Sequence, residues 1–229
     1  MSLFAIADLH LSFGSDKPMD IFKGWDDYTE RIEKNWRCVV TEDDTVVIAG
    51  DISWALKLKD TRKDFTFLES LPGKKILLKG NHDYWWQTKS KLERFFAENA
   101  FDSLSVLFNC AYTVDHFCVC GTRGWFYDAE HDEDKKILNR EVGRLRTSIE
   151  CAEKTGLEPI VFLHYPPVFG TVVCKEILGV LQEKNIKKCY YGHIHGSDAM
   201  KKAVVGDYLG IQFRLISCDC IGFMPVLVR

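Results

Sequence analysis

Five short hydrophobic runs in this chain each end in a polar side chain, and this recurrence constrains the fold more than any other feature. The runs span residues 3–7, 45–49, 75–78, 159–163 and 188–191. The polar residues that follow them are Asp8 and His10, Asp51, Asn81, His164, and finally His193 with His195. Carboxylates, amides and imidazoles are poor core residues, but they suit the rim of a polar site at the end of a strand.

Helical patterns separate the first three hydrophobic runs and also the last two. Apolar residues recur every three or four positions from Tyr28 to Val39, and similar spacing predicts helices in the later part of 56–71 and within 87–99, 132–153 and 175–183. Strands that alternate with helices are typical of a parallel sheet with crossover helices. The carboxyl ends of parallel strands share one edge, where ligands bind, so we expect residues 8, 51, 81, 164 and 193 to converge.

The remaining segments have a different pattern. Short runs at 105–108, 111–114 and 117–120, separated by polar turns, predict an antiparallel meander, and residues 121–125 are predicted to form an irregular loop. Alternating runs at 203–205, 212–217 and 224–228 predict strands near the C-terminus. No shift of composition marks a linker, so we expect residues 1–229 to form a single domain.

Composition argues against several classes of protein. Of the 229 residues 46% are hydrophobic, which allows a substantial core, and the net charge of -3 gives no basic footprint for extended nucleic acid or an anionic membrane. No apolar run approaches the length of a membrane span, and the N-terminus lacks the basic region of a signal peptide. The nine cysteines include no C-x-x-C pair, so we expect reduced, mostly buried thiols in a cytoplasmic protein. Disulfides or cysteine-bound metal are the alternative.

The polar residues at the strand ends form a mixed set of oxygen and nitrogen ligands. Such a set, without thiolate, suits manganese, iron, zinc, nickel or cobalt. Seven side chains exceed the demand of one catalytic ion, which usually keeps an open position for water. Two ions that share a carboxylate fit better, and they can clamp both oxygens of an in-line displacement at phosphorus and lower the pKa of a shared water. We therefore expect two divalent transition-metal ions as cofactors, with manganese preferred.

Asp8-x-His10, Gly50-Asp51, the tetrapeptide 80–83, His164 and the tetrapeptide 192–195 together resemble the five motifs of the calcineurin-like metallophosphoesterases. The resemblance extends from residue 4 to about residue 196, and the motifs come in the order of the family. It implies an α/β fold, a four-layer αββα sandwich of two mixed β-sheets flanked by helices. Residues 203–228 would then contribute to the second sheet.

The resemblance also implies a role for each motif residue. The first ion would be held by Asp8, His10 and His195, the second by Asn81, His164 and His193, and Asp51 would bridge them. Asn81 would also contact the substrate, and metal-bound hydroxide would attack phosphorus. His82 would contact the phosphoryl oxygen or protonate the leaving group, since an imidazole can carry a proton near neutral pH. Asp83 would either orient His82 or cap the helix that follows.

One departure from the pattern bears on the substrate. Many phosphoprotein phosphatases of the superfamily follow the bridging aspartate with an acidic, arginine-containing segment, which residues 52–55 lack. His10 completes the first site and permits diester as well as monoester chemistry, and no large cap domain is inserted. We expect hydrolysis of small phosphate esters, with phosphodiesters of small molecules or nucleotides preferred. The alternatives are a phosphomonoesterase, a nuclease, or an inert interaction scaffold, although the acidic balance disfavours extended nucleic acid.

A few further residues have open roles. Arg123, between glycines, either binds substrate phosphate or belongs to an ordinary surface loop. The aromatic residues 84–86 either pack against the next helix, with one tryptophan partly at the rim, or stack on a nucleobase. His116 and His131 have no ligand-type neighbours and are expected to be ordinary surface or turn residues.

Overall fold

The first of two large sheets contains the strands that begin the chain. β1 (Leu3–Ile6), β2 (Thr45–Ala49), β3 (Lys74–Leu78) and β4 (Leu104–Val106) are parallel, and β13 (Val226–Leu227) pairs antiparallel with β1. Every residue of β2 is buried, as expected for a parallel strand that is covered on both faces. The computed structural model describes residues 1–125 and 132–229.

The second sheet has the order β11-β12-β10-β7-β6-β5. β6 (Phe117–Thr122), β7 (Glu158–Leu163), β10 (Lys188–Tyr191) and β12 (Ile211–Leu215) are parallel, while β5 (Tyr112–Val114) and β11 (Gly206–Tyr208) form antiparallel edges. Leu163 pairs with both Thr122 and Tyr191, so three strands end level with one another. The residues that follow these strands therefore lie at one edge.

The helices connect the strands and cover the outer sides of both sheets. They are α1 (Tyr28–Val39), the 3₁₀ turn η1 (Leu58–Thr61), α2 (Arg62–Ser70), α3 (Lys89–Glu98), α4 (Asp132–Glu153), α5 (Lys175–Glu183) and the short α6 (Ser197–Met200). A small ribbon of β8 (Val168–Phe169) and β9 (Val172–Val173) follows β7. The helices predicted at 28–39, 132–153 and 175–183 are confirmed with those boundaries.

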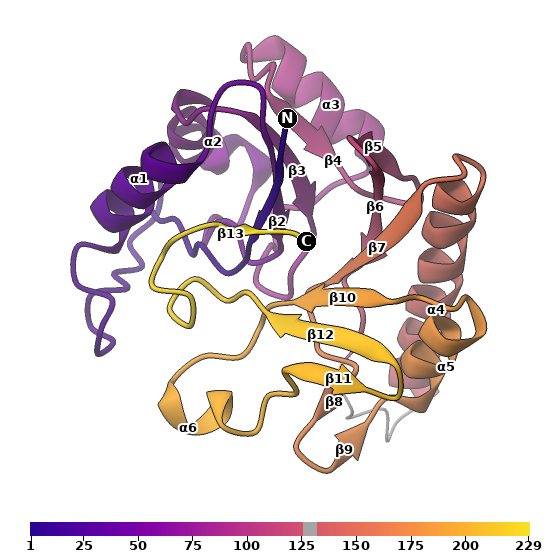
Figure 1. The fold of residues 1–229 in the computed structure, drawn as a ribbon. Coiled ribbons are helices and arrows are strands. Elements are labelled where there is room, and N and C mark those ends of the chain that lie inside the picture. The colour runs from indigo at the N-terminus through magenta and orange to yellow at the C-terminus, as the bar shows by residue number, and fades with distance from the viewer. Residues whose placement is uncertain (126–131) are drawn as a thin grey trace.

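Three clusters of buried hydrophobic residues define the layers of the fold. One packs α1–α3 against the first sheet, a second packs α4 and α5 against the second sheet, and a third lies between the sheets. Figure 1 shows the same arrangement, with α1–α3 on one outer side and α4 and α5 on the other. The third cluster includes Val47 and Phe162, one from each sheet. The predicted αββα sandwich of two mixed sheets is confirmed.

Four predictions about individual segments are wrong. The meander does not form, because β4 pairs with β3 in the first sheet, whereas β5 and β6 form a hairpin in the second. The loop predicted at 121–125 begins later, because β6 extends to Thr122. Gly121 is needed in this strand because an added Cβ would lie 1.9 Å from the carbonyl oxygen of Phe162. Residues 203–205, predicted as a strand, instead precede β11. The C-terminal residues were expected in the second sheet, but β13 pairs with β1 in the first sheet. Periodicity within a run does not reveal which sheet a strand joins.

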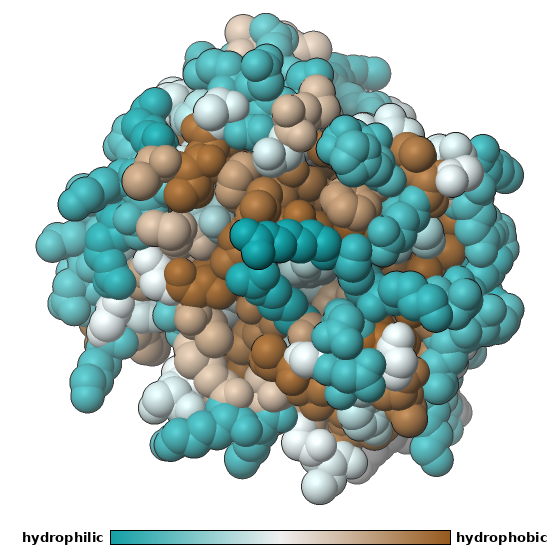
Figure 2. Space-filling view, in the orientation of Figure 1, coloured by the Kyte–Doolittle hydropathy of each residue, from teal (hydrophilic) through white to brown (hydrophobic). Residues whose placement is uncertain are grey.

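The surface and the cysteines add little to the picture of function. Hydrophilic side chains form most of the rim of the face in Figure 2, while hydrophobic ones are visible mainly between the elements near its centre. Among the described residues, no helix combines the length and the apolar character needed to cross a membrane. All nine cysteines are unbridged, and Cys118 and Cys120 lie in the same hydrophobic cluster, as C-x-C spacing on a strand predicts.

Candidate metal centre

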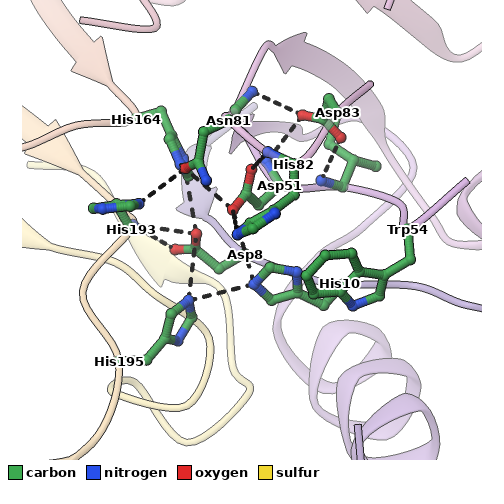
Figure 3. A network of polar contacts seen from close by, with 12 residues as sticks. Asp8, His10, Asp51, Trp54, Asn81, His82, Asp83, His164, His193 and His195 are labelled. Atoms are coloured by element: carbon green, nitrogen blue, oxygen red, sulfur yellow. Dashed lines mark hydrogen bonds and ion pairs between the residues drawn. The ribbon is translucent and has the colours of Figure 1, made fainter. Parts of the chain in front are cut away.

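The structure brings all seven predicted metal ligands together at the edge where the parallel strands of both sheets end. Figure 3 shows their side chains directed toward one another from the loops after β1, β2, β3, β7 and β10. The two sheets are joined at this edge by backbone, because the amide of Ala7 after β1 donates to the carbonyl of Ile216 after β12 at 2.9 Å. The predicted convergence of residues 8, 51, 81, 164 and 193 is confirmed.

One group of ligand atoms comes from Asp8, His10 and His195. The chosen donor atoms all lie within 4.8 Å of one another. The Nε2 atom of His195 is 3.4 Å from Nε2 of His10 and 3.6 Å from a carboxylate oxygen of Asp8. Asp8 and His10 are buried, so a cation bound here would be largely shielded from solvent.

A second group consists of Asp51, His164 and His193, again with donor atoms within 4.8 Å of one another. The amide oxygen of Asn81 joins this group, at 2.6 Å from Nε2 of His164 and 2.9 Å from Nδ1 of His193. Asp51 lies between the two groups, since its Oδ2 atom is 3.5 Å from Nε2 of His164 and 3.9 Å from Nε2 of His10. The carboxylate is therefore placed where it could contact ions in both groups.

Outer partners orient two of the histidines. Nδ1 of His164 is 3.0 Å from the carbonyl oxygen of Ala49, and Nδ1 of His195 is 2.9 Å from Oδ1 of Asp219. A hydrogen bond donated from Nδ1 leaves Nε2 free to bind a metal. Asp219 also accepts from the amide of Gly196 at 3.1 Å. Sequence reasoning missed Asp219, because it lies in a tail segment in which nothing but the C-x-C pair stands out.

The backbone of the centre is strained at four of the ligand residues. Asp8, His10, Asp51 and His193 have φ angles of 62°, 47°, 51° and 71°. Non-glycine residues seldom adopt this left-handed region, and each such residue costs about 1–2 kcal/mol. Strain of this kind persists where the surrounding structure imposes it, and it clusters at functional sites. The turns aim these side chains back across the ends of the strands.

Gly80 permits a close approach between two loops of the centre. A Cβ atom added to it would lie 2.1 Å from Oδ1 of Asp51. Gly192 is similar, because its Cβ would lie 2.6 Å from a carboxylate oxygen of Asp8. Both glycines are therefore required by contact with a ligand carboxylate, and neither can be replaced without displacing it.

His82 and Asp83 occupy different positions relative to the ligands. The amide of His82 donates to Oδ1 of Asp51 at 2.8 Å, and its half-exposed ring has Nε2 4.0 Å from the other Asp51 oxygen. Asp83 is buried behind Asp51, where it accepts hydrogen bonds from the amides of Asp51, Ile52 and Gly80 at 2.7–3.0 Å (Figure 3).

Neither of the roles predicted for Asp83 matches its contacts. The helix-cap alternative is wrong, because α3 begins at Lys89 with Thr88 at its N-cap. Among the described residues, Asp83 accepts no hydrogen bond from the ring of His82 either, and the Nδ1 atom of that ring is buried without a partner. Asp83 instead ties the loop after β2 to the loop after β3. Burial and the nearby Asp51 raise the pKa of Asp83 to about 7, although the hydrogen bonds that it accepts from backbone amides lower this pKa.

An aromatic hollow of about 510 Å³ adjoins the first ligand group. We use this name for the space lined by His10, Met19, Phe22, Lys23, Trp25, Trp54, His82, His195, Gly196 and Asp219. The ring of Trp54 stacks on His10, with centroids 4.8 Å apart, and lies 4.5 Å from His82. Trp25 and Trp54 come from the loops after β1 and β2, and sequence reasoning did not identify them as pocket residues.

The other residues with open roles lie away from the ligands. Trp85 is fully buried and Trp86 is half-buried, as the packing alternative predicts, whereas Tyr84 is exposed. The side chain of Arg123 contacts none of the seven ligands, although its carbonyl accepts from the amide of His164 at 3.1 Å. His116 is exposed, as predicted, and His131 lies outside the described residues.

The electrostatics of the centre favour a cation. Burial alone would raise the pKa of Asp8, but His195 and the other nearby histidines hold it well below its usual range. Burial opposes the charge of His195, yet Asp8 and Asp219 raise its pKa to about 10. Burial and Asp8 raise the pKa of Asp51 to about 8, and burial lowers the pKa of His10 to about 3. A bound cation would displace the protons that His195 and Asp51 retain.

The donor set therefore fits divalent metal ions. Each group offers carboxylate oxygen and imidazole nitrogen within one coordination shell, which is the set expected for manganese, iron, zinc, nickel or cobalt. Among the described residues, no lysine or arginine pairs with Asp8 or Asp51, although both carboxylates are buried. Metal ions would provide the positive charge that such buried carboxylates require.

Comparison with solved structures finds chains of the same fold. TT1561 of Thermus thermophilus is 11% identical with a TM-score of 0.60, over 99% of this chain and 97% of that one. Phosphopantetheinyl hydrolase (PptH) from Mycobacterium tuberculosis is 14% identical with a TM-score of 0.54, over 94% and 88%. The protein of unknown function AQ665 from Aquifex aeolicus is 16% identical with a TM-score of 0.53, over 99% and 95%. At these identities the likeness shows the fold alone.

Comparison at the level of sequence is decisive for the family. No curated protein matches the chain. The model of the calcineurin-like phosphoesterase family, however, matches residues 1–197, a range that includes every predicted ligand from Asp8 to His195. The chain therefore belongs to the calcineurin-like phosphoesterase family.

Proposed function

We propose that this chain is a phosphoesterase that uses two divalent transition-metal ions and hydrolyses phosphodiesters of small molecules, nucleotides included. The observation that carries the proposal is the pair of ligand groups that meet at Asp51. One ion would be held by Asp8, His10 and His195. The other would be held by Asn81, His164 and His193, and Asp51 would contact both. Manganese is the ion we expect first. Two ions so placed would lower the pKa of a shared water and offset the charge of the phosphoryl oxygens.

The protein itself supplies a proton donor for the leaving group. His82 lies in the wall of the aromatic hollow, and its Nε2 atom is 4.0 Å from Asp51. Burial lowers its pKa from the ordinary value, with a further contribution from nearby histidines, so the protonated ring is a stronger acid than a free imidazole. Such a group can donate a proton to the departing alkoxide, which typically accelerates a reaction by about 10²–10⁴-fold.

The surroundings of the centre support a small diester as substrate. The aromatic hollow adjoins His10, His82 and His195, so it can receive an aromatic or apolar alcohol on one side of the scissile phosphate. Offset stacking on Trp54 would suit a flat ring. The net charge of -3 continues to disfavour extended nucleic acid as a partner, and a cytoplasmic location remains our expectation.

A matrix of metals and substrates tests the proposal. The purified chain, loaded in turn with Mn²⁺, Ni²⁺, Zn²⁺ or Fe²⁺, is assayed with an aryl monoester, an aryl diester, cyclic nucleotides and single-stranded DNA. We expect the highest kcat/KM with Mn²⁺ and a diester. Preference for the monoester or for DNA would replace this substrate class with a phosphatase or a nuclease. Failure to bind any metal stoichiometrically would indicate an inert scaffold.

Two variants test the residue roles. Asp51→Asn should abolish turnover, because the carboxylate shared by both ligand groups is lost. His82→Ala should reduce kcat by about 10²-fold or more while the metal content stays at the wild-type level. An active Asp51→Asn protein would contradict the proposed arrangement, whereas loss of metal from His82→Ala would show that His82 acts as a ligand.

A further inference from the structure

A second cavity, of about 370 Å³, is lined by three cationic side chains. Lys79 follows β3, Arg123 follows β6, and Arg144 lies on α4. Together with Glu141 and Phe108 they form what we call the cationic pocket. Because β3 and β6 end at the edge where the metal ligands gather, the pocket belongs to the same end of the sandwich as the centre.

Backbone connections place the cationic pocket beside the second ligand group. Lys79 precedes Asn81 by two residues, so their Cα atoms are at most about 7 Å apart. The carbonyl oxygen of Arg123 accepts from the amides of His164 and Tyr165, at 3.1 and 2.9 Å. A ligand of moderate length can therefore contact the second ligand group and the pocket at the same time.

The charges in the pocket do not balance. Glu141 is the carboxylate in the lining; it accepts a hydrogen bond from Arg144, and its Oε1 atom is 3.8 Å from Nη2 of Arg123. Its other oxygen accepts from the hydroxyl of Thr122 at 2.5 Å. Among the described residues that line the pocket, three cations face this one carboxylate, which leaves two positive charges.

Donors in the pocket also lack acceptors. The Nε atom of Arg123 is buried and has no hydrogen-bond partner among the residues that the structure describes. Within residues 1–125 and 132–229, the side chain of Lys79 makes no hydrogen bond or ion pair. Arg123 stacks on Trp125 and Arg144 on Phe108, at 4.9 and 5.0 Å from the ring centroids. A guanidinium stacked in this way keeps its N–H edge available for a ligand, and unfilled buried donors are rare in folded proteins.

We propose that the cationic pocket binds a second phosphate of the substrate, so that the preferred substrates carry an anionic group on one arm of the scissile phosphate. Arginine pairs bind phosphate through charge-assisted hydrogen bonds, and lysine adds a point charge. This inference rests on the proposed function and narrows its substrate class. It also gives Arg123 the phosphate contact that was one of the two roles left open by the sequence, but away from the metal ligands.

The first test compares two p-nitrophenyl phosphodiesters that differ only in the second arm. One arm ends in a hydroxyl, and the other, of equal length, ends in a phosphonate that cannot itself be hydrolysed. With the Mn²⁺-loaded full chain we expect kcat/KM to favour the phosphonate arm by about tenfold or more, the usual effect of a hydrogen bond to a charged group. Arg144→Gln and Lys79→Gln should each bring the ratio of the two kcat/KM values toward one.

Arg140→Gln is the matched control, because Arg140 is exposed on the same helix one turn away and does not line the pocket. It makes the same change of charge and should leave the ratio at the wild-type value. If the ratio is one in the wild-type protein, or if Arg140→Gln lowers it as much as Arg144→Gln, the inference is overturned. In that case hydrolysis of the hydroxyl-arm diester would still support the proposed function.

A binding experiment decides the inference independently of turnover. Calorimetric titration of the Mn²⁺-loaded chain compares an alkane bisphosphonate with the monophosphonate of the same chain length. We expect the bisphosphonate to bind about tenfold more tightly in the wild-type protein and equally in Arg144→Gln. Equal wild-type affinities would overturn the inference, even if inorganic phosphate bound at Arg144. Tight bisphosphonate binding without hydrolysis of either diester would support the pocket and contradict the proposed function.

Discussion

Replacement of Asp83 by asparagine is the sharpest test of how the centre is held together. The two carboxylate oxygens accept from the amides of Gly80, Asp51, Ile52 and Ser53, at 2.7, 3.0, 2.9 and 3.3 Å. The indole nitrogen of Trp85 also donates to Oδ1, at 3.1 Å. Asp83→Asn preserves the shape of the side chain but turns one of these acceptors into a donor that faces other donors.

The magnitude follows from the number of donors that lose an acceptor. Oδ2 accepts hydrogen bonds from two amides, and Oδ1 accepts from the remaining donors. At least two N–H groups are therefore left unpaired, whichever way the side-chain amide introduced by Asp83→Asn is oriented. Each buried, unpaired N–H costs about 1–3 kcal/mol, which gives a loss of about 4 kcal/mol in the free energy of unfolding. With an m-value of about 3 kcal/mol/M, the urea midpoint should fall by about 1.3 M.

The assay is urea unfolding followed by tryptophan fluorescence, together with the Mn²⁺ content of the protein. Measurement at pH 8 keeps Asp83 ionised, because its pKa is about 7. Asp115→Asn is the matched control: Asp115 is an exposed loop carboxylate, and its replacement should change stability by less than about 0.5 kcal/mol. An Asp83→Asn protein with the wild-type midpoint and full metal content would refute the idea that Asp83 ties the two loops together.

Three further predictions concern the same centre. Asp219→Asn removes the charge that holds His195, and Mn²⁺ affinity should fall about 10–100-fold; an unchanged calorimetric Kd would contradict this role. Asp51 and His195, with pKa values of about 8 and 10, retain protons that an ion must displace, so Mn²⁺ affinity should rise from pH 6 to pH 8 with proton release, and a pH-independent Kd would be inconsistent with these values. Gly80→Ala places a Cβ 2.1 Å from Asp51 and should lower the free energy of unfolding by about 1–3 kcal/mol, measured in urea; wild-type stability would show that the loops can separate freely.

Much of the architecture could be predicted from hydrophobic pattern alone. The strand Thr45–Ala49 and the helix Asp132–Glu153 have the boundaries that the sequence indicates. Runs of β-branched residues favour strands buried on both faces, and long 3.6-residue periodicity favours helices, because each pattern brings apolar side chains to the faces that pack. The alternation of these elements led correctly to parallel strands and to an edge where the ligands meet.

Other features depend on contacts between distant parts of the chain. β4 and β5 have similar short patterns, yet they lie in different sheets because α3 leads β4 alongside β3. Residues 121–125 were predicted to form an irregular loop, but strand pairing extends to Thr122, and the side chain of Arg123 lies beside Glu141. In both cases the deciding interaction involves residues that are distant in sequence, so local pattern carries no information about it.

By itself, the sequence determined which side chains are available to bind metal and that strand ends would present them, because ligand chemistry and strand periodicity are local properties. Tertiary structure decided how those side chains are arranged. Asp83 became a tie between two loops, and Asp219 became a partner of His195. These roles arise from left-handed turns and from contacts between loops of different strands, which form only when the two sheets pack together.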